Sequence, residues 1–187
     1  QMCIRDRVKK YGAFLWMDPG EPAVRKRTLD VVLDVVTRYD IDGVHIDDSF
    51  YPYPISAGRG RGDRPFPDDA SWAAYRKARG TLSRDDWRRE NVNTLVRELA
   101  EGIRAAKPWV KFGISPFGIW RPGSPTSVRG FDAYVKLYAD ARKWMPEGWG
   151  DYFSPQLYWP TYKDGQRYGT LLEWWALQNR QGRHLWP

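Results

Sequence analysis

The chain has 187 residues, enough for one domain with a hydrophobic core and too few for two large ones. Hydrophobic residues make up 42% of it and aromatic residues 16%, with 11 tryptophans, a composition that excludes an intrinsically disordered chain. The formal net charge is +7, but the basic residues are spread over predicted helices and one loop, residues 59–64. Such a distribution favours a solvated surface over a nucleic-acid site.

The cysteine and histidine content limits the kinds of site that the chain can build. Cys3 is the one cysteine, which excludes an internal disulfide and a thiolate metal cluster, and the two histidines, His45 and His184, offer little for zinc. No apolar run approaches the ~20 residues of a membrane span. We therefore expect no metal ion, no cofactor, no nucleic-acid partner and no membrane span in this chain.

The elements predicted from periodicity follow a leader, residues 1–10, whose first seven residues show no periodicity and no secretion signal. A cloning or assembly remnant is one origin for this leader. Residues 13–17 are predicted as a short strand and residues 22–39 as an amphipathic helix, with Pro22 suited to its first turn. Residues 43–47, GVHID, form a short, β-branched run that begins with a glycine, which predicts a second strand.

A long loop rich in Pro, Gly and Arg then leads to a second helix. Ser83 with Asp86 three residues later forms a capping-box-like start, and Pro108 stops the helix at Lys107. The elements predicted after it are a strand over residues 110–115, a helix with Tyr134, Leu137, Tyr138, Ala141 and Trp144 on one face, a strand over residues 151–159 and a helix over residues 171–179.

Strands and helices thus alternate about four times, and the strands over residues 43–47 and 110–115 lack a polar face, as parallel strands covered on both faces do. The loops after strands are long and rich in Asp, Trp, Tyr and Pro, whereas the loops before strands are short. A (β/α)8 or TIM barrel builds its functional face from the loops after strands, so this asymmetry favours that α/β fold. A doubly wound open sheet is the alternative, but no Gly-rich phosphate turn follows any strand. Because a complete barrel takes ~250 residues, we expect residues 11–187 to form a partial barrel domain.

Two adjacent carboxylates, Asp47 and Asp48, stand where the strand over residues 43–47 ends. If Val44 and Ile46 face the helices, Asp47 points into the barrel at its mouth, and Asp48 begins the loop over the same cavity. Two carboxylates so close do not both ionise easily. One of them is therefore expected to have a raised pKa and to serve as a proton donor near neutral pH.

Other interpretations of this pair stay open. A helix cap with a salt bridge to an arginine is the structural one. A magnesium or calcium site is another, but the neighbouring strand ends offer Ser115 and Gln156 in place of further acids. His45 lies one step from Asp47 on the same face of the strand, so it is either a satisfied core residue or part of the site.

Aromatic residues follow each predicted strand end: Tyr51 and Tyr53 after the first, Trp120 after the second, and Tyr158 and Trp159 after the third. Aromatic rings in the loops of an open barrel face stack against the apolar C–H faces of sugars, whose hydroxyls bind Asp, Gln and Arg. These residues therefore indicate a carbohydrate substrate. Nucleophilic Ser or Cys catalysis has little support, because there is no GxSxG motif.

Four runs, WMDPGEPAVR, VVLDVVTRYDIDGVHIDDSFYPYP, DDWRRENVNTLVRELAEGIRAAKPWVKFGISPFGIWRPG and LYADARKWMPEGWGDYFSPQLYWP, resemble the bacterial glycosyl-hydrolase-like family 10, also called domain of unknown function 187. The resemblance covers Trp16 to about Trp175. It implies a (β/α)8 barrel of which this chain holds the central portion, about strands 4 to 6 with their helices. It also implies glycosidase activity on bacterial cell-wall glycans in exported or lipid-anchored proteins, and hence a periplasmic, cell-surface or secreted location.

A second, shorter likeness concerns mechanism. The run HIDD at a strand end is similar to the paired acids of retaining hexosaminidases that use the 2-acetamido group of the substrate as nucleophile. In that scheme Asp47 orients the acetamide nitrogen, and Asp48 protonates the leaving oxygen and then acts as base toward water. The competing scheme makes Asp47 a covalent nucleophile, with an acid/base elsewhere: Asp18, Asp68, Asp69 or a residue outside this chain.

The sequence thus predicts a glycosidase with Asp47 and Asp48 as catalytic carboxylates and a polysaccharide or glycan as substrate. A non-catalytic carbohydrate-binding barrel is the alternative, because it would keep the aromatic rings without needing Asp48. The residues expected to bind the substrate are His45, Tyr51, Tyr53, Ser115, Trp120, Gln156, Tyr158, Trp159 and Asp18.

Overall fold

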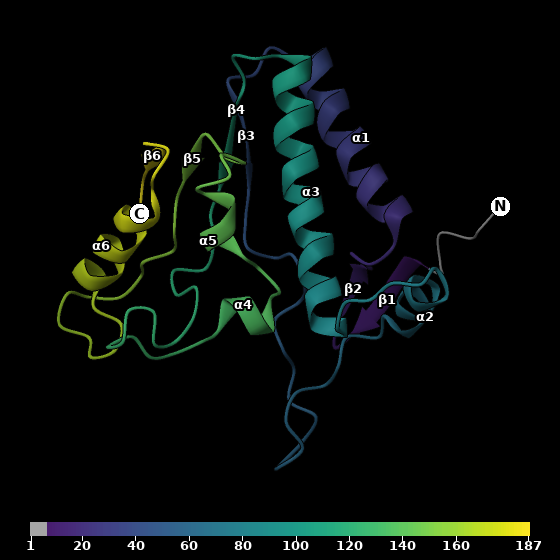
Figure 1. The fold of residues 1–187 in the computed structure, drawn as a ribbon, viewed down its shortest axis with the longest axis horizontal. Helices are drawn as coiled ribbons and strands as arrows, with labels where there is room; N and C mark the ends of the chain where they lie inside the picture. The colour runs from purple at the N-terminus through teal and green to yellow at the C-terminus, as the bar shows by residue number, and fades with distance from the viewer. Residues whose placement is uncertain (1–6) are drawn as a thin grey trace.

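The computed structural model describes residues 7–187. Its centre is a four-stranded parallel sheet in the order β3-β4-β5-β6. The strands are β3 (Gly43–Ile46), β4 (Lys111–Ile114), β5 (Tyr152–Phe153) and β6 (His184–Leu185). Helices α1 (Pro22–Arg38) and α3 (Arg84–Ala106) pack side by side, and α3 also contacts β4 (Figure 1). The α/β class with a parallel sheet is therefore confirmed, whereas closure into a barrel stays a prediction.

Helix α3 forms where the capping signal predicts it. The Ser83 hydroxyl accepts a hydrogen bond from the Asp86 backbone N–H at 3.1 Å, which satisfies one of the free donors of the first turn. The helix ends at Ala106, just before Pro108. Its buried face, which includes Val96 and Ile103, packs into the main hydrophobic core together with residues of β4.

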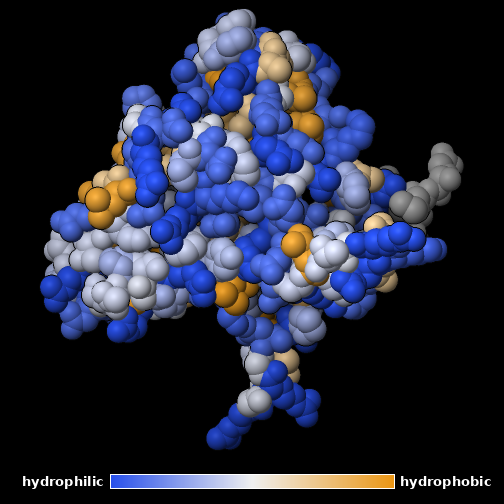
Figure 2. Space-filling model, viewed as in Figure 1, coloured by the Kyte–Doolittle hydropathy of each residue, from blue (hydrophilic) through white to orange (hydrophobic). Residues whose placement is uncertain are grey.

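Helix α1 begins with Pro22 in its first turn, as predicted. Its apolar stripe is only partly covered, because Val24 and Val36 are buried while Val31 and Val35 are exposed. The face of the molecule in Figure 2 is mostly hydrophilic, with apolar residues in separate patches, one of them on the part formed by α1 and α3. Within residues 7–187 no helix is long and apolar enough to cross a membrane.

The predicted strand over residues 13–17 forms as β2 (Phe14–Met17), but it lies outside the parallel sheet. It pairs antiparallel with β1 (Val8–Tyr11), and Gly12, at φ +61°, lies in the connecting turn. Val8 to Lys10 belong to the predicted leader and nevertheless form strand structure. The first six residues of that leader lie outside the described residues.

Two predicted elements differ in the structure. The single helix expected around residues 134–144 is two short ones, α4 (Ala133–Lys136) and α5 (Ala141–Trp144), because Tyr138 adopts a left-handed backbone with φ +55°. The strand expected over residues 151–159 is limited to β5, because Pro155 has no N–H to continue a ladder. Beyond it Gln156 forms one isolated parallel bridge with Phe117.

Helix α6 (Tyr168–Gln178) confirms the helix predicted at residues 171–179, and it begins three residues earlier. Helix α2 (Asp69–Lys77) and strand β6 were not predicted. The loop between β3 and α2 contains a segment, residues 55–64, that projects from the body of the molecule below the sheet (Figure 1). The same projection carries mainly hydrophilic residues (Figure 2).

Candidate active site

The two adjacent acids lie directly after β3, and side chains from the ends of the neighbouring strands converge on them. The Asp48 backbone N–H donates to Asp47 Oδ1 at 2.8 Å. The Gln156 amide donates to the same oxygen at 2.7 Å and to the Ser115 carbonyl at 3.2 Å. The Ser115 hydroxyl in turn donates to the Ser154 carbonyl at 2.8 Å. The structure thus brings together four residues that the sequence analysis named: Asp47, Asp48, Ser115 and Gln156.

The two carboxylates have different environments. Asp47 is exposed, whereas Asp48 is only 4% exposed. Burial raises the pKa of Asp48, and the negative charge of Asp47 raises it further. The hydrogen bond that Asp48 Oδ2 accepts from the Tyr53 hydroxyl, 2.5 Å long, acts in the opposite direction, as does the Gln156 amide. The sequence analysis expected a raised pKa for one of the two acids, and the environment of Asp48 raises its pKa.

An aromatic cluster lies next to Asp48. The Tyr53 ring packs on Phe131 with centroids 5.4 Å apart. Phe131 lies 5.0 Å from Phe117, and Phe117 lies 5.8 Å from Trp159. Tyr158, the neighbour of Trp159, is 84% exposed.

Tyr53 and Trp159 are therefore joined through two rings, Phe117 and Phe131, that the sequence analysis missed. A signal for Phe117 was present, because it follows the strand end in the run SPFG. Exposed rings beside a buried acid suit the apolar face of a sugar.

His45 lies on the exposed face of the sheet and contacts β5. Its ring stacks on Tyr152 at 5.6 Å, and its Nδ1 lies 3.0 Å from the Tyr152 hydroxyl. This contact depends on Gly113 in the strand between them, because a Cβ there would lie 1.8 Å from the Tyr152 ring. His45, Gly113 and Tyr152 are neighbours in register across the three strands. The face on which Asp47 was expected to point is thus lined by polar aromatic groups.

Three residues that were expected to bind the substrate, Tyr51, Trp120 and Asp18, have contacts other than Asp48 and its neighbours. Tyr51 is 1% exposed, with its ring 4.9 Å from Tyr138 and 5.4 Å from Phe66. Trp120 stacks on Trp174 at 5.9 Å, and its indole N–H donates to Asp140. Tyr51 therefore packs against the loop before α2 and the segment after α4, and Trp120 packs against α6.

Asp18 is fully buried. It accepts hydrogen bonds from the Gly20 N–H at 2.9 Å and from the Ser71 hydroxyl at 2.8 Å, and burial raises its pKa. These partners are those of a side chain that closes a turn and ties it to α2. The buried position explains why an acid in a loop need not belong to the site.

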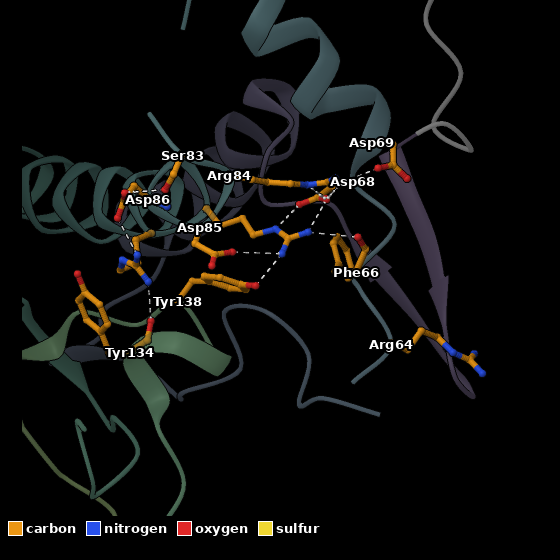
Figure 3. Close-up of polar contacts among 12 residues, drawn as sticks. Arg64, Phe66, Asp68, Asp69, Ser83, Arg84, Asp85, Asp86, Tyr134 and Tyr138 are labelled. Atoms are coloured by element: carbon orange, nitrogen blue, oxygen red, sulfur yellow. Dashed lines mark hydrogen bonds and ion pairs between the residues drawn. The ribbon is translucent and has the colours of Figure 1, made fainter. Parts of the chain in front are cut away.

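A second group of charges contacts Tyr51 through Arg88, whose guanidinium carbon lies 5.9 Å from the centre of the Tyr51 ring. Asp68 is fully buried and accepts hydrogen bonds from Arg84 and from Arg88, whose Nε and Nη2 lie 2.7 Å from its two oxygens. Arg88 also donates to the Tyr138 hydroxyl at 2.6 Å and to the Phe66 carbonyl at 3.3 Å. Figure 3 shows Asp68, Arg84, Phe66 and Tyr138 in this arrangement. The group joins the loop after β3, the start of α3 and the segment after α4.

Asp47 is one of the residues that line a cavity of about 420 Å³. Its lining is mainly apolar and comes from β2, α1, α3 and the end of β3: Trp16, Val24, Ile46, Phe50, Val92 and Leu95 are among its residues. This lining does not match the hydroxyls of a sugar. Within residues 7–187 no group of three or more acidic, histidine or cysteine side chains is arranged to hold a metal ion.

Comparisons with known proteins show the family of the chain. The family model described as glycosyl hydrolase-like 10 matches residues 2–184. The chain is 44% identical over 176 residues to glycosyl hydrolase YngK of Bacillus subtilis, covering 91% of this chain and 33% of that protein. It is 39% identical over 177 residues to glycosyl hydrolase DigH of Escherichia coli K12, covering 92% of this chain and 38% of that protein. The chain thus spans about a third of the length of these relatives. It belongs to the glycosyl hydrolase-like 10 family.

Proposed function

We propose that this chain carries the catalytic carboxylates of a glycosidase that cleaves N-acetylhexosamine-containing glycan of the bacterial cell wall. The observation that carries the proposal is the pair itself: a buried Asp48 with a raised pKa directly beside an exposed Asp47. The family and its named relatives support the reaction class. The four parallel strands are, in this proposal, part of a (β/α)8 barrel in an exported protein.

In the proposed reaction Asp48 is the general acid. Its carboxyl group gives its proton to the glycosidic oxygen as the bond from that oxygen to the anomeric carbon breaks. The acetamido oxygen of the same sugar attacks the anomeric carbon and forms a cyclic oxazolinium. Asp47 accepts a hydrogen bond from the acetamide N–H and stabilises the positive charge that develops there. Asp48, now ionised, removes a proton from the water that opens the ring.

The position of Asp47 suits this role. Its Oδ1 is held by the Gln156 amide and by the Asp48 N–H, and the side chain faces solvent. Neutral donors fix the orientation of the carboxylate without neutralising its charge. The charge therefore remains for a group on the substrate.

The covalent scheme, in which Asp47 is the nucleophile, needs a separate acid/base. Two of its candidates have other partners, because Asp18 bonds to Gly20 and Ser71 and Asp68 bonds to two arginines. The third candidate, Asp69, is paired with Arg84 at 2.8 Å. The acid/base of the covalent scheme would then be a residue outside this chain, whereas the substrate-assisted scheme uses Asp47 and Asp48 alone.

The two schemes separate on inhibition of the full-length protein. An N-acetylhexosamine thiazoline, which mimics the cyclic intermediate, should inhibit release of reducing ends from a chitin-type or peptidoglycan strand. Substrates without the acetamido group should not turn over. Turnover of such substrates with no inhibition by the thiazoline would contradict substrate assistance, and glycan binding without any turnover would favour the non-catalytic alternative.

A further inference from the structure

Tyr53 was expected to stack on the sugar, but its hydroxyl has a more specific contact. It donates to Asp48 Oδ2 at 2.5 Å, the shortest contact of either carboxylate in the pair with a side chain. The ring is 43% exposed, so one end of this residue is bonded to a buried acid and its body borders solvent. A simple stacking residue does not require that hydroxyl contact.

We propose that Tyr53 is a positioning residue for the proposed reaction: its hydroxyl occupies Asp48 Oδ2, so that the transferable proton resides on Oδ1. This inference rests on the proposed function, because it assigns a partner to the proposed general acid. A carboxylic acid carries its proton on one oxygen, and a donor bonded to the other oxygen selects which one. The direction in which Asp48 can deliver its proton is thereby fixed.

The backbone around Tyr53 is suited to hold such a contact. Tyr53 lies between Pro52 and Pro54, and each proline fixes its own φ near −65° and restricts the residue before it to extended conformations. Tyr51, the residue before Pro52, is buried and packs against Phe66 and Tyr138. Residues 51–54 therefore have few accessible backbone conformations. Little further conformational entropy is lost when Tyr53 is held against Asp48.

The ring is held as well as the backbone. Tyr53 packs on Phe131 at 5.4 Å and on Phe117 at 6.5 Å, and these two rings contact each other. Phe117 and Phe131 both belong to the loop after β4, whereas Tyr53 belongs to the loop after β3. The Tyr53 hydroxyl thus comes from one loop, and its ring packs against another. Tyr53 therefore couples the aromatic cluster to the acid.

The titratable groups that act on Asp48 are Asp47, from the same loop, and Tyr53. The neutral Gln156 amide after β5 also acts on it as a hydrogen-bond donor. The Tyr53 bond favours the ionised carboxylate, because the hydroxyl donates to it. Burial, the bond to Asp48 and the charges of Asp48 and Asp47 raise the pKa of Tyr53. The hydroxyl thus remains a donor wherever Asp48 titrates, and its removal should raise the pKa of Asp48.

The test is the pH profile of kcat/KM for Tyr53→Phe in the full-length protein. The alkaline limb, which reports loss of the Asp48 proton in the free enzyme, should move up by about one pH unit. The value of kcat at the optimum should fall about tenfold with little change in KM, since the ring that borders the sugar is retained. Tyr39→Phe is the matched control, because Tyr39 is 53% exposed and lies at the end of α1, before β3, whereas Asp48 follows β3.

A second variant keeps the test independent of folding. 3-Fluorotyrosine at position 53 retains the ring and strengthens the donor, so the alkaline limb should move down. Limbs that superimpose on the wild type in both variants, with Asp48→Asn inactive, would overturn the role of Tyr53 and leave the proposed function intact. Wild-type activity in Asp48→Asn would instead overturn the proposed function itself.

Discussion

Asp48 and Asp68 are both buried carboxylates, and their partners are opposite in kind. Asp68 is fully buried and receives hydrogen bonds from two arginines, with Arg88 itself only 6% exposed. Asp48 is 4% exposed, accepts a hydrogen bond from the neutral Tyr53 hydroxyl and lies next to a second acid, Asp47. The buried Asp68 is thus paired with positive charges, whereas the buried Asp48 has no positively charged partner among its contacts within residues 7–187.

The difference separates a structural ion pair from a chemical site. Burial by itself lowers the pKa of Arg88, but the hydrogen bonds and charge of Asp68 outweigh it and raise that pKa overall. Arg88 therefore stays charged. At Asp48, burial and the neighbouring Asp47 act in the same direction and favour the protonated acid. Such a pair does not stabilise the fold, and this supports the proposed catalytic role of Asp48.

The largest effect on folding is expected at the compensated pair. Asp68→Asn leaves two arginines facing a neutral amide, one of them buried, and should lower the free energy of unfolding by about 3–5 kcal/mol. Urea denaturation of the full-length protein measures it. Asp69→Asn is the matched control, because its carboxylate is 85% exposed and should contribute within about 0.5 kcal/mol. Equal stability of the two variants would contradict the structural role of Asp68.

A smaller effect, on catalysis, is expected from the neutral partner of the acid pair. Gln156→Ala removes the amide that orients Asp47, so kcat should fall about tenfold on N-acetylhexosamine glycan. Stability should change by less than about 1 kcal/mol, because the lost bond involves an exposed carboxylate. A large loss of stability with unchanged kcat would make Gln156 part of the scaffold.

The smallest effect is the pH dependence of stability. The pKa of Asp48 in the folded state is raised above its unfolded value of 3.8, so its contribution to stability is fully present below that value and is lost as pH rises through the folded pKa. Asp48→Asn should therefore become more stable relative to the wild type as pH increases from about 3 to 7. Thermal melts across that range measure the difference. If the stability of Asp48→Asn relative to the wild type decreased with rising pH, the charge of Asp48 would be stabilised in the folded state, which would contradict this account.

Much of this arrangement is predictable from local signals. Ser83 and Pro108 predict both ends of α3, and the position of Asp47 and Asp48 at a strand end predicts that side chains after β4 and β5 meet them. These features depend on neighbouring residues and on strand order. Local chemistry therefore suffices for them.

The errors come from tertiary packing. Tyr138 breaks the expected third helix because its hydroxyl accepts from Arg88 and its ring packs on Tyr51, contacts that the helical period does not reveal. Tyr51 and Tyr53 are two residues apart in one run, YPYP, yet one is buried and the other borders solvent. No propensity distinguishes them, because the choice depends on which ring Arg88 and Phe66 cover.

The turnover of Asp48→Asn tests the central claim most directly. In the full-length protein, on an N-acetylhexosamine glycan, kcat should fall by about 10²–10⁴ while the unfolding transition stays at or above that of the wild type. Asp69→Asn, with its exposed carboxylate, should retain wild-type turnover. An Asp48→Asn protein that is folded and as active as the wild type would contradict the assignment of Asp48 as the general acid.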